Sequence, residues 1–185
     1  VHSSYIVTQD DQGMLIIDQH ALHERAMFEY LLARIADRPL ERQQLLTPVP
    51  VPATAGQVEM LDALQTLLER IGIEAGPLGP TTIGVRTFPS FLFDRGVDPV
   101  DFMQGVLCRA EAEGFTPDSE QALRDVLDMM SCKAAVKAGD RMSHEELDHL
   151  VRLRTEVERS SNCPHGRPTS IRITVKDLER MFGRS

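Results

Sequence analysis

Residues 5–35 read YIVTQDDQGMLIIDQHALHERAMFEYLLARI, and this stretch decides the fold class. Two apolar runs, Tyr5–Val7 and Met14–Ile17, flank a polar segment that contains a glycine, a pattern that predicts a β-hairpin. The second strand of this hairpin would end at Asp18. From Ala21 onward the apolar residues recur at helical spacing, so we expect a helix directly after the hairpin. This combination of strands and helices predicts an α/β (α+β) fold.

Glu24 is the unusual residue of the predicted helix. It shares one face with apolar side chains, namely Ala21, Phe28, Leu31 and Ile35. An isolated buried carboxylate is costly unless it is paired, protonated or bound to a metal ion. Glu24 is therefore the first candidate for a functional side chain.

The rest of the chain also predicts mixed secondary structure. Pro48–Pro52, with the sequence PVPVP, is typical of an extended linker or edge segment and marks a subdomain boundary. Beyond it we predict helices over Gln57–Ile71, Pro99–Glu113, Ser119–Ala138 and Leu178–Phe182, a turn at Gly76–Pro80, and strands at Thr82–Phe88 and around Ile171–Val175. We therefore divide the chain into one subdomain formed by residues 1–48 and 119–185 and an inserted one formed by residues 49–118.

Composition further limits the class of protein. The chain has 185 residues, 42% of them hydrophobic, enough for one domain or two small ones. It begins with Val1 and shows no signal-peptide pattern, so we expect a fragment of a longer protein. No apolar stretch approaches the roughly 20 residues that span a bilayer, so we expect a soluble protein. The 3 cysteines are an odd number, which argues against a disulfide framework and for thiols that can bind metals.

The charge of the chain bears on nucleic-acid binding. Attraction to a phosphate backbone comes mostly from lysine and arginine, and the formal net charge of −8 opposes it. If this chain acts on DNA, we expect another protein to bring it there.

Metal-ligating residue types gather first at the predicted strand-to-helix junction. Asp18 ends the strand, and His20 and Glu24 are four positions apart, so they share a helix face as two ligands of one metal require. Glu29 lies five positions beyond Glu24, points elsewhere and is a weaker candidate.

Cysteine and histidine supply further donors near the other end of the chain. Cys163 and His165 flank a proline in a polar loop, and Cys132 lies among small residues where another element can approach closely. With the junction residues these side chains suffice for two ions that share a bridging carboxylate. Two such ions stabilise the attacking and the leaving oxygens in phosphodiester cleavage. The mixed ligation is typical of a catalytic site rather than a closed structural one.

Each of these residues also has an ordinary interpretation. Cys108 and Cys132 would each be an inert, buried thiol. His20 would be a helix-start residue with ordinary hydrogen bonds, and the pair of Cys163 and His165 would be a chance spacing. Only the combination favours a metal.

Four motifs in this order resemble the MutL mismatch-repair proteins that carry an endonuclease. Asp18–Glu29 matches D-Q-H-A-x2-E-x4-E, Ser131–Ala138 resembles the second motif, Cys163–Pro168 reads C-P-H-G-R-P, and Phe182–Arg184 is similar to the terminal F-x-R. The motif positions without an assigned role are Glu29, Lys133, Phe182 and Arg184. The resemblance spans nearly the whole chain, except for the region between about residues 50 and 118.

The resemblance implies a dimerisation and endonuclease subdomain built from both chain ends, with an external regulatory subdomain between them. It implies a homodimer that nicks duplex DNA, a phosphodiester hydrolase in which Mn²⁺ supports nicking and Zn²⁺ has a structural or regulatory role. Its metal ligands would be Asp18, His20, Glu24, Cys132, Cys163 and His165. Arg167 would contact a phosphate or, alternatively, form an ordinary salt bridge.

The same resemblance implies several partners. These are an N-terminal ATPase domain of the same protein, a mismatch-recognition protein and the replication sliding clamp. The location would be the bacterial cytoplasm, in association with DNA. This fragment has no glycine-rich phosphate-binding motif, so we expect no ATP site in it.

One short segment resembles the motif by which proteins of this family bind the clamp. Gln43–Pro48 matches Q-x-x-L-x-P, with Gln43 for a polar pocket, Leu46 for an apolar one and Pro48 to stiffen the segment. A helix-to-loop transition is the alternative interpretation. A clamp that encircles DNA would supply the local concentration that an acidic domain lacks.

Two non-enzymatic functions stay open beside the endonuclease: a zinc-stabilised dimerisation module and a clamp-bound scaffold. Asp18, His20 and Glu24 argue against the first, because a closed structural site does not need extra carboxylates. For the enzyme we predict attack by a metal-activated water on phosphorus, without a covalent protein intermediate. For the dimer we predict an interface on the exposed face of the N- and C-terminal strands.

Overall fold

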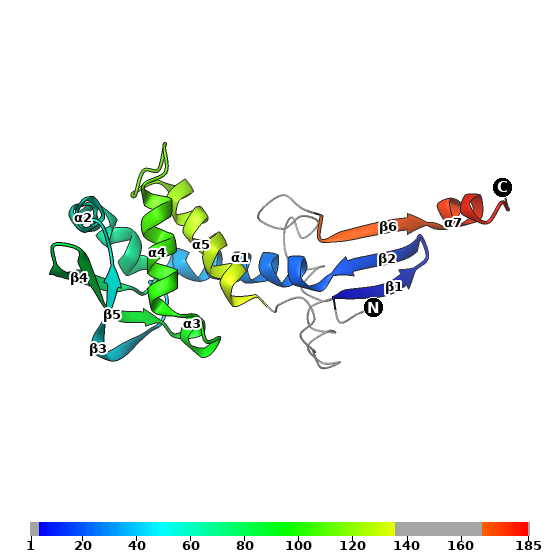
Figure 1. Ribbon diagram of the computed structural model, residues 1–185. Coiled ribbons are helices and arrows are strands. Elements are labelled where there is room, and N and C mark those ends of the chain that lie inside the picture. The colour runs from blue at the N-terminus through cyan, green and yellow to red at the C-terminus, as the bar shows by residue number, and fades with distance from the viewer. Residues whose placement is uncertain (1–3, 136–167, 185) are drawn as a thin grey trace. The chain divides into compact units, whose positions relative to one another are not determined.

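The computed structural model describes residues 4–135 and 168–184 (Figure 1). The chain divides into two compact units, one formed by Val1–Glu29 with Ala135–Ser185 and the other by Tyr30–Ala134. The described residues contain two three-stranded antiparallel sheets and six helices. The predicted α/β (α+β) class is confirmed.

The first sheet joins the two ends of the chain. It has the strand order β1-β2-β6, with β1 at Tyr5–Asp10, β2 at Gly13–Asp18 and β6 at Ser170–Thr174 (Figure 1). The predicted hairpin is therefore confirmed. Gly13 closes its turn with a φ of 138°, and a Cβ there would lie 2.3 Å from the carbonyl oxygen of Ile173. Only glycine allows β6 to approach the turn this closely.

The predicted C-terminal elements are confirmed with one change. Val175 does not continue β6 but begins helix α7, which covers Val175–Met181. Thr174 caps this helix, because its hydroxyl accepts from the backbone N–H of Asp177 and the Asp177 carboxylate bonds back to Thr174. This capping box ends the strand one residue earlier than alternation of apolar residues suggests.

Helix α1 covers Gln19–Asp37 and begins immediately after β2, as predicted. Its first turn closes the small core of the first unit, in which Leu22 packs with Leu15 and Ile17, and Ile6 lies against them. These side chains share the face of the sheet that carries Ile17 and its partner Ile6. The boundary between the two compact units falls within this helix, after Glu29.

An ion pair ties the C-terminal strand to the hairpin. The Arg172 guanidinium donates to both carboxylate oxygens of Asp10, over 2.6 and 2.7 Å. This hydrogen-bonded contact, together with the backbone N–H of Gln12, lowers the pKa of Asp10 from 3.8 to about 2. The bidentate geometry fixes the register between the hairpin turn and β6.

This ion pair predicts a pH dependence. Because folding lowers the pKa of Asp10 from 3.8 to about 2, the pair stabilises the fold above about pH 4 and loses that effect as the pH falls towards 2. Replacing Arg172 with glutamine should return the pKa of Asp10 towards its ordinary value. Titration of the carboxyl by NMR measures this change, and an Asp10 pKa still near 2 in the variant would contradict the assignment.

The second unit is built on the sheet β3-β5-β4. Its strands are β3 at Arg42–Pro52, β4 at Glu74–Gly79 and β5 at Thr82–Pro89. In addition to the second part of α1, its helices are α2 at Ala55–Arg70, α3 at Ser90–Asp94, α4 at Pro99–Ala110 and α5 at Glu120–Ala134. Its core contains an edge-on contact between Phe88 and Phe102, with ring centroids 5.8 Å apart. The predicted strand at Thr82–Phe88 and the helices from Gln57, Pro99 and Ser119 are confirmed. The predicted end of the last of these, at Ala138, lies outside the described residues.

Two local predictions in this unit are wrong. Gly76–Pro80 is not a turn, because Glu74–Gly79 forms β4, which pairs with β5. Glycine and Pro77 are tolerated there because β4 lies at the edge of the sheet, where one side of the backbone needs no partner. The helix from Pro99 ends at Ala110 rather than Glu113.

The compact units divide the chain at 29/30 and 134/135 rather than at the predicted boundaries 48/49 and 118/119. The strand β3 pairs with β5 on both sides of residue 48, through Gln43 with Phe88 and Val51 with Ile83, so all of it belongs to the second unit. Helix α5 contacts α3 of that unit. The functional roles assigned to the two subdomains stay predictions.

Candidate functional site

Asp18 lies at the junction between β2 and α1, where two hydrogen bonds fix its position. Its backbone N–H donates to the carbonyl oxygen of Thr169 over 2.9 Å, and its carboxylate accepts from the backbone N–H of Ala21 over 3.1 Å. The next residue, Gln19, donates its backbone N–H to Ser4 over 3.0 Å. The Asp18 carboxylate therefore caps the first turn of α1 and is held at the end of the strand.

His20 and Glu24 lie one turn apart on α1, as the sequence predicts. His20 is half-buried, whereas Glu24 is only 4% exposed. The predicted burial of Glu24 is thus confirmed. A carboxylate at this depth, one turn from an imidazole and close in sequence to a second carboxylate, has the donor chemistry that Mn²⁺ or Zn²⁺ requires.

The described residues hold only part of the predicted ligand set. Within 4–135 and 168–184 no three side chains of His, Cys, Asp or Glu lie close enough together to hold a metal ion. Cys163, His165 and Arg167 lie outside the described residues. Cys132 belongs to α5 in the second unit and is exposed, as is Cys108 on α4, so neither is the buried, inert thiol of the ordinary interpretation.

Glu29 has a partner on its own helix. Its carboxylate accepts from the Arg25 guanidinium one turn earlier. Its exposed fraction is 27%, against 11% for the side chain of Arg25. The prediction that Glu29 points away from Glu24 is consistent with this contact.

The remaining motif positions are exposed. Lys133 lies in the last turn of α5. Phe182 is the C-cap residue of α7 and is 75% exposed, and the backbone N–H of Arg184 donates to the carbonyl oxygen of Glu179 over 2.9 Å. The roles of these three residues stay open.

The Q-x-x-L-x-P segment lies in the edge strand β3, so the alternative of a helix-to-loop transition is wrong. The pairing with β5 shifts within this segment. Gln44 pairs with Thr87 and Val49 pairs with Val85, so β3 advances by five residues where β5 advances by only two. The extra residues of β3 form a bulge. Leu46 projects from it with its side chain fully exposed, and Gln43 and Pro48 are exposed as well.

The prolines of β3 shape its outer edge. The backbone N–H of Ala53 donates to Thr81 over 3.0 Å, which shows that odd-numbered residues of this segment direct their N–H groups inward. Pro48, Pro50 and Pro52 therefore turn their nitrogen atoms outward, where a missing N–H costs no hydrogen bond of the sheet. This edge presents no N–H donors over Pro48–Pro52 and resists the addition of another strand.

Comparison with known proteins decides the family. Residues 1–142 match the family model described as the MutL C terminal dimerisation domain. The chain belongs to this family.

Curated relatives extend the match over the whole chain. It is 35% identical to the DNA mismatch repair protein MutL of Bradyrhizobium sp. (strain ORS 278) over 184 residues, which are 100% of this chain and 30% of that protein. It is 33% identical to MutL of Ralstonia nicotianae over 98% of this chain and 28% of the relative. It is 32% identical to MutL of Halalkalibacterium halodurans, over 100% of this chain and 28% of that relative. The chain thus spans less than a third of the length of these relatives.

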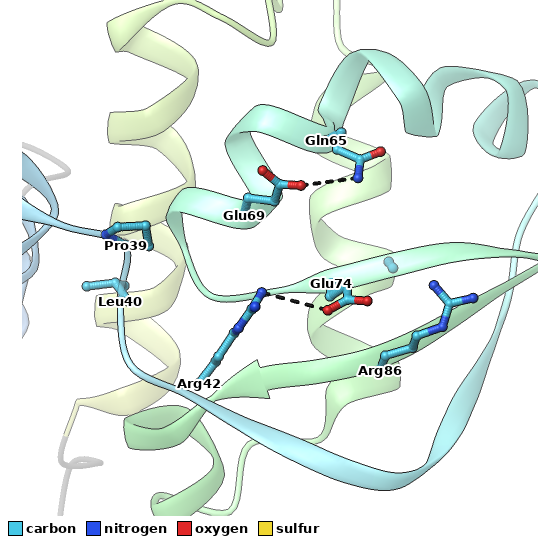
Figure 2. Close-up of a pocket in the computed structure, with 8 residues that line it drawn as sticks. Pro39, Leu40, Arg42, Gln65, Glu69, Glu74 and Arg86 are labelled. Atoms are coloured by element: carbon cyan, nitrogen blue, oxygen red, sulfur yellow. Dashed lines mark hydrogen bonds and ion pairs between the residues drawn. The ribbon is translucent and has the colours of Figure 1, made fainter.

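A polar pocket in the second unit of this family member was not predicted (Figure 2). It has a volume of about 520 Å³ and is lined by Pro39, Leu40, Arg42, Gln65, Glu69, Glu74, Ala75 and Arg86. Arg42 and Glu74 form a loose ion pair of 3.8 Å, and Gln65 donates to Glu69 over 3.2 Å. Its residues come from four separate segments, so no local sequence pattern marks it.

The described helices also bear on membranes. Among residues 4–135 and 168–184 no helix is both long and apolar enough to cross a bilayer.

Proposed function

We propose that this chain is the part of a DNA mismatch-repair protein that nicks duplex DNA with bound divalent metal ions, and that it acts as a homodimer. The observation that carries the proposal is the burial of Glu24 at 4% exposure, one helical turn after His20 and close to the capped Asp18. A buried carboxylate is retained at such a position when a cation or a partner compensates it. The mismatch-repair function named for the relatives agrees with this chemistry.

Asp18, His20 and Glu24 would hold the metal ions together with Cys163 and His165. Bound metal would lower the pKa of the attacking water and stabilise the charge that develops on the phosphate. The chain itself contributes orientation and exclusion of water. The backbone contacts of Asp18 with Thr169 and Ala21 fix one carboxylate, and burial of Glu24 strengthens its attraction for a cation. Arg167 would contact a phosphate of the DNA.

The direct test is an assay of plasmid nicking. Supercoiled plasmid is incubated with the chain, the sliding clamp and Mn²⁺, and the nicked circle is quantified. We expect nicking with Mn²⁺ and none with a chelator. Zinc binding and dimerisation without nicking would favour the non-catalytic module, and a stable protein–DNA adduct during turnover would contradict direct attack by water.

The face of the first sheet opposite its core is the proposed dimer interface. In the strand register Val7 and Ile171 both lie beside Ile16, and Ile173 lies beside Met14, so these side chains share one face. Tyr5 and Val7 are each 46% exposed and Ile171 is 59% exposed. An apolar face of this kind on three strands fits a second copy of the same chain.

The bulge of β3 is the proposed binding segment for the sliding clamp. Leu46 is fully exposed and Gln43 is exposed, so both side chains can enter pockets of a partner without refolding of the strand. The edge at Pro48–Pro52 offers no N–H donors for strand addition, so the partner would be held mainly by side chains rather than by backbone pairing.

Replacing Gln43 and Leu46 together with alanine should abolish clamp binding, a loss of about 100-fold or more in affinity. The fold should be unaffected, because neither side chain is buried. Surface plasmon resonance with immobilised clamp measures the binding, and thermal unfolding checks the fold. Clamp-independent nicking at high Mn²⁺ concentration should persist. Unchanged clamp affinity would exclude this segment as the docking site.

A further inference from the structure

Arg25 is a buried charged residue next to Glu24. It is 9% exposed, and its guanidinium donates to the Glu29 carboxylate and lies 5.5 Å from the centroid of the Phe28 ring. Within the described part of the chain its buried Nε has no hydrogen-bond acceptor. Glu29 is thus the carboxylate that the structure supplies for this guanidinium.

Helix geometry separates Glu29 from the face of the candidate metal ligands. At about 100° per residue, His20 and Glu24 are about 40° apart around the helix axis, and Arg25 and Glu29 are also about 40° apart. Glu24 and Glu29, by contrast, are about 140° apart. The contact between Arg25 and Glu29 agrees with this geometry.

We propose that Glu29 is not a metal ligand but a positioning residue that neutralises Arg25. The inference rests on the proposed metal site. A buried guanidinium one residue from Glu24 would repel a divalent cation bound there, because charges in a partly buried site are weakly screened. With Glu29 the charges of Asp18, Glu24, Arg25 and Glu29 sum to −2, and without it they sum to −1.

The ion pair with Arg25 gives a physical reason for the position of the second glutamate in the motif at Asp18–Glu29. Glu29 is four positions from Arg25, the distance at which two helical side chains meet. The guanidinium also lies over the Phe28 ring, a cation–π contact that adds to the ion pair. The second glutamate of the motif then acts on the metal through Arg25 and makes no contact with the ion.

Binding of Mn²⁺ to the chain, measured by titration calorimetry, tests the proposal with four variants. Glu29→Gln should weaken Mn²⁺ binding by roughly fivefold to tenfold, since it leaves Arg25 uncompensated. Arg25→Met should bind Mn²⁺ at least as tightly as the wild type. The double variant, Arg25→Met with Glu29→Gln, should regain wild-type affinity because the charge sum is again −2. Glu59→Gln, at an exposed position on α2, is the matched control.

The double variant decides between the two roles of Glu29. If Glu29 were a ligand, the double variant would bind Mn²⁺ as weakly as Glu29→Gln, and the proposal would be overturned. Unchanged affinity in Glu29→Gln would overturn it as well. If Glu29→Gln does not fold, Arg25→Met and the double variant still decide, since only a ligand role predicts weaker binding in the double variant.

A metal-free measurement keeps this proposal distinct from the metal site itself. In thermal unfolding without metal, Glu29→Gln should lower Tm and the added Arg25→Met should restore part of the loss, because removing both charges leaves no uncompensated guanidinium. If the decreases in Tm caused by the two single substitutions simply add in the double variant, the ion pair between Arg25 and Glu29 would be refuted. Mn²⁺ affinity that is unaffected by Glu24→Gln would instead refute the proposed metal site and leave the ion pair standing.

Discussion

Replacing Glu24 with glutamine should reduce manganese-dependent nicking of supercoiled plasmid by about 100-fold or more. The substitution keeps the volume of the side chain and removes its charge. Glu24 is only 4% exposed, so water cannot take the place of the lost carboxylate beside a bound cation. The initial rate of nicked-circle formation, with the clamp present, measures the effect.

Control variants separate loss of the site from loss of the fold. The glutamine variant should keep its circular dichroism spectrum and its dimeric mass, and Glu59→Gln on the exposed face of α2 should nick at the wild-type rate. Glu24→Lys places a cation where the metal would bind and should be equally inactive. Nicking by Glu24→Gln at more than half the wild-type rate would remove Glu24 from the catalytic machinery.

Local patterns were sufficient to predict the first unit's hairpin and helix. The apolar runs around Gly13 and the helical spacing from Ala21 are properties of neighbouring residues, and they also placed Glu24 on the buried face. The position of β6 beside β2 could not be predicted in this way. Its pairing of Ile173 with Met14 joins residues far apart in sequence, and the Arg172 contact that fixes the register is equally remote.

The wrongly predicted turn in the second unit has a physical cause. Glycine and proline disfavour regular structure on average, but at a sheet edge one side of the backbone needs no partner. The same tolerance allows Pro77 in β4 and Pro48–Pro52 in β3. The predicted turn at Gly76–Pro80 is therefore largely an edge strand, whereas the edge segment predicted at Pro48–Pro52 is confirmed as part of β3.

The candidate site shows where a motif alone is ambiguous. Helical spacing within Asp18–Glu29 places Glu24, and not Glu29, on the same face as His20, but it does not show what Glu29 contacts. The spacing of Arg25 and Glu29 is visible in the sequence, but the burial of Arg25 is not, and that burial is what gives Glu29 its role. Likewise Q-x-x-L-x-P did not reveal that Leu46 projects from a bulge.

Replacing Val7 and Ile171 together with aspartate should convert the dimer to a monomer. Both residues flank Ile16 on the face of the first sheet opposite its core, and they are 46% and 59% exposed. Aspartate at these positions is hydrated in the monomer but would be buried without a partner in the dimer, so the dissociation constant should rise by about 100-fold or more. Light scattering after size-exclusion chromatography, at about ten times the wild-type dissociation constant, measures the mass.

The control for this interface lies on the same strand. Thr8 is exposed and its side chain points to the opposite face of β1, so Thr8→Asp should leave the dimer intact. The variant with aspartate at both Val7 and Ile171 should still fold as a stable monomer in thermal unfolding, because the core residues Leu15, Ile17 and Leu22 are unchanged. A dimeric double variant, or a monomeric Thr8→Asp, would place the interface elsewhere on the chain. A monomer that still binds Mn²⁺ would show that the metal site is complete within one copy, so that dimerisation serves to position the two sites rather than to form them.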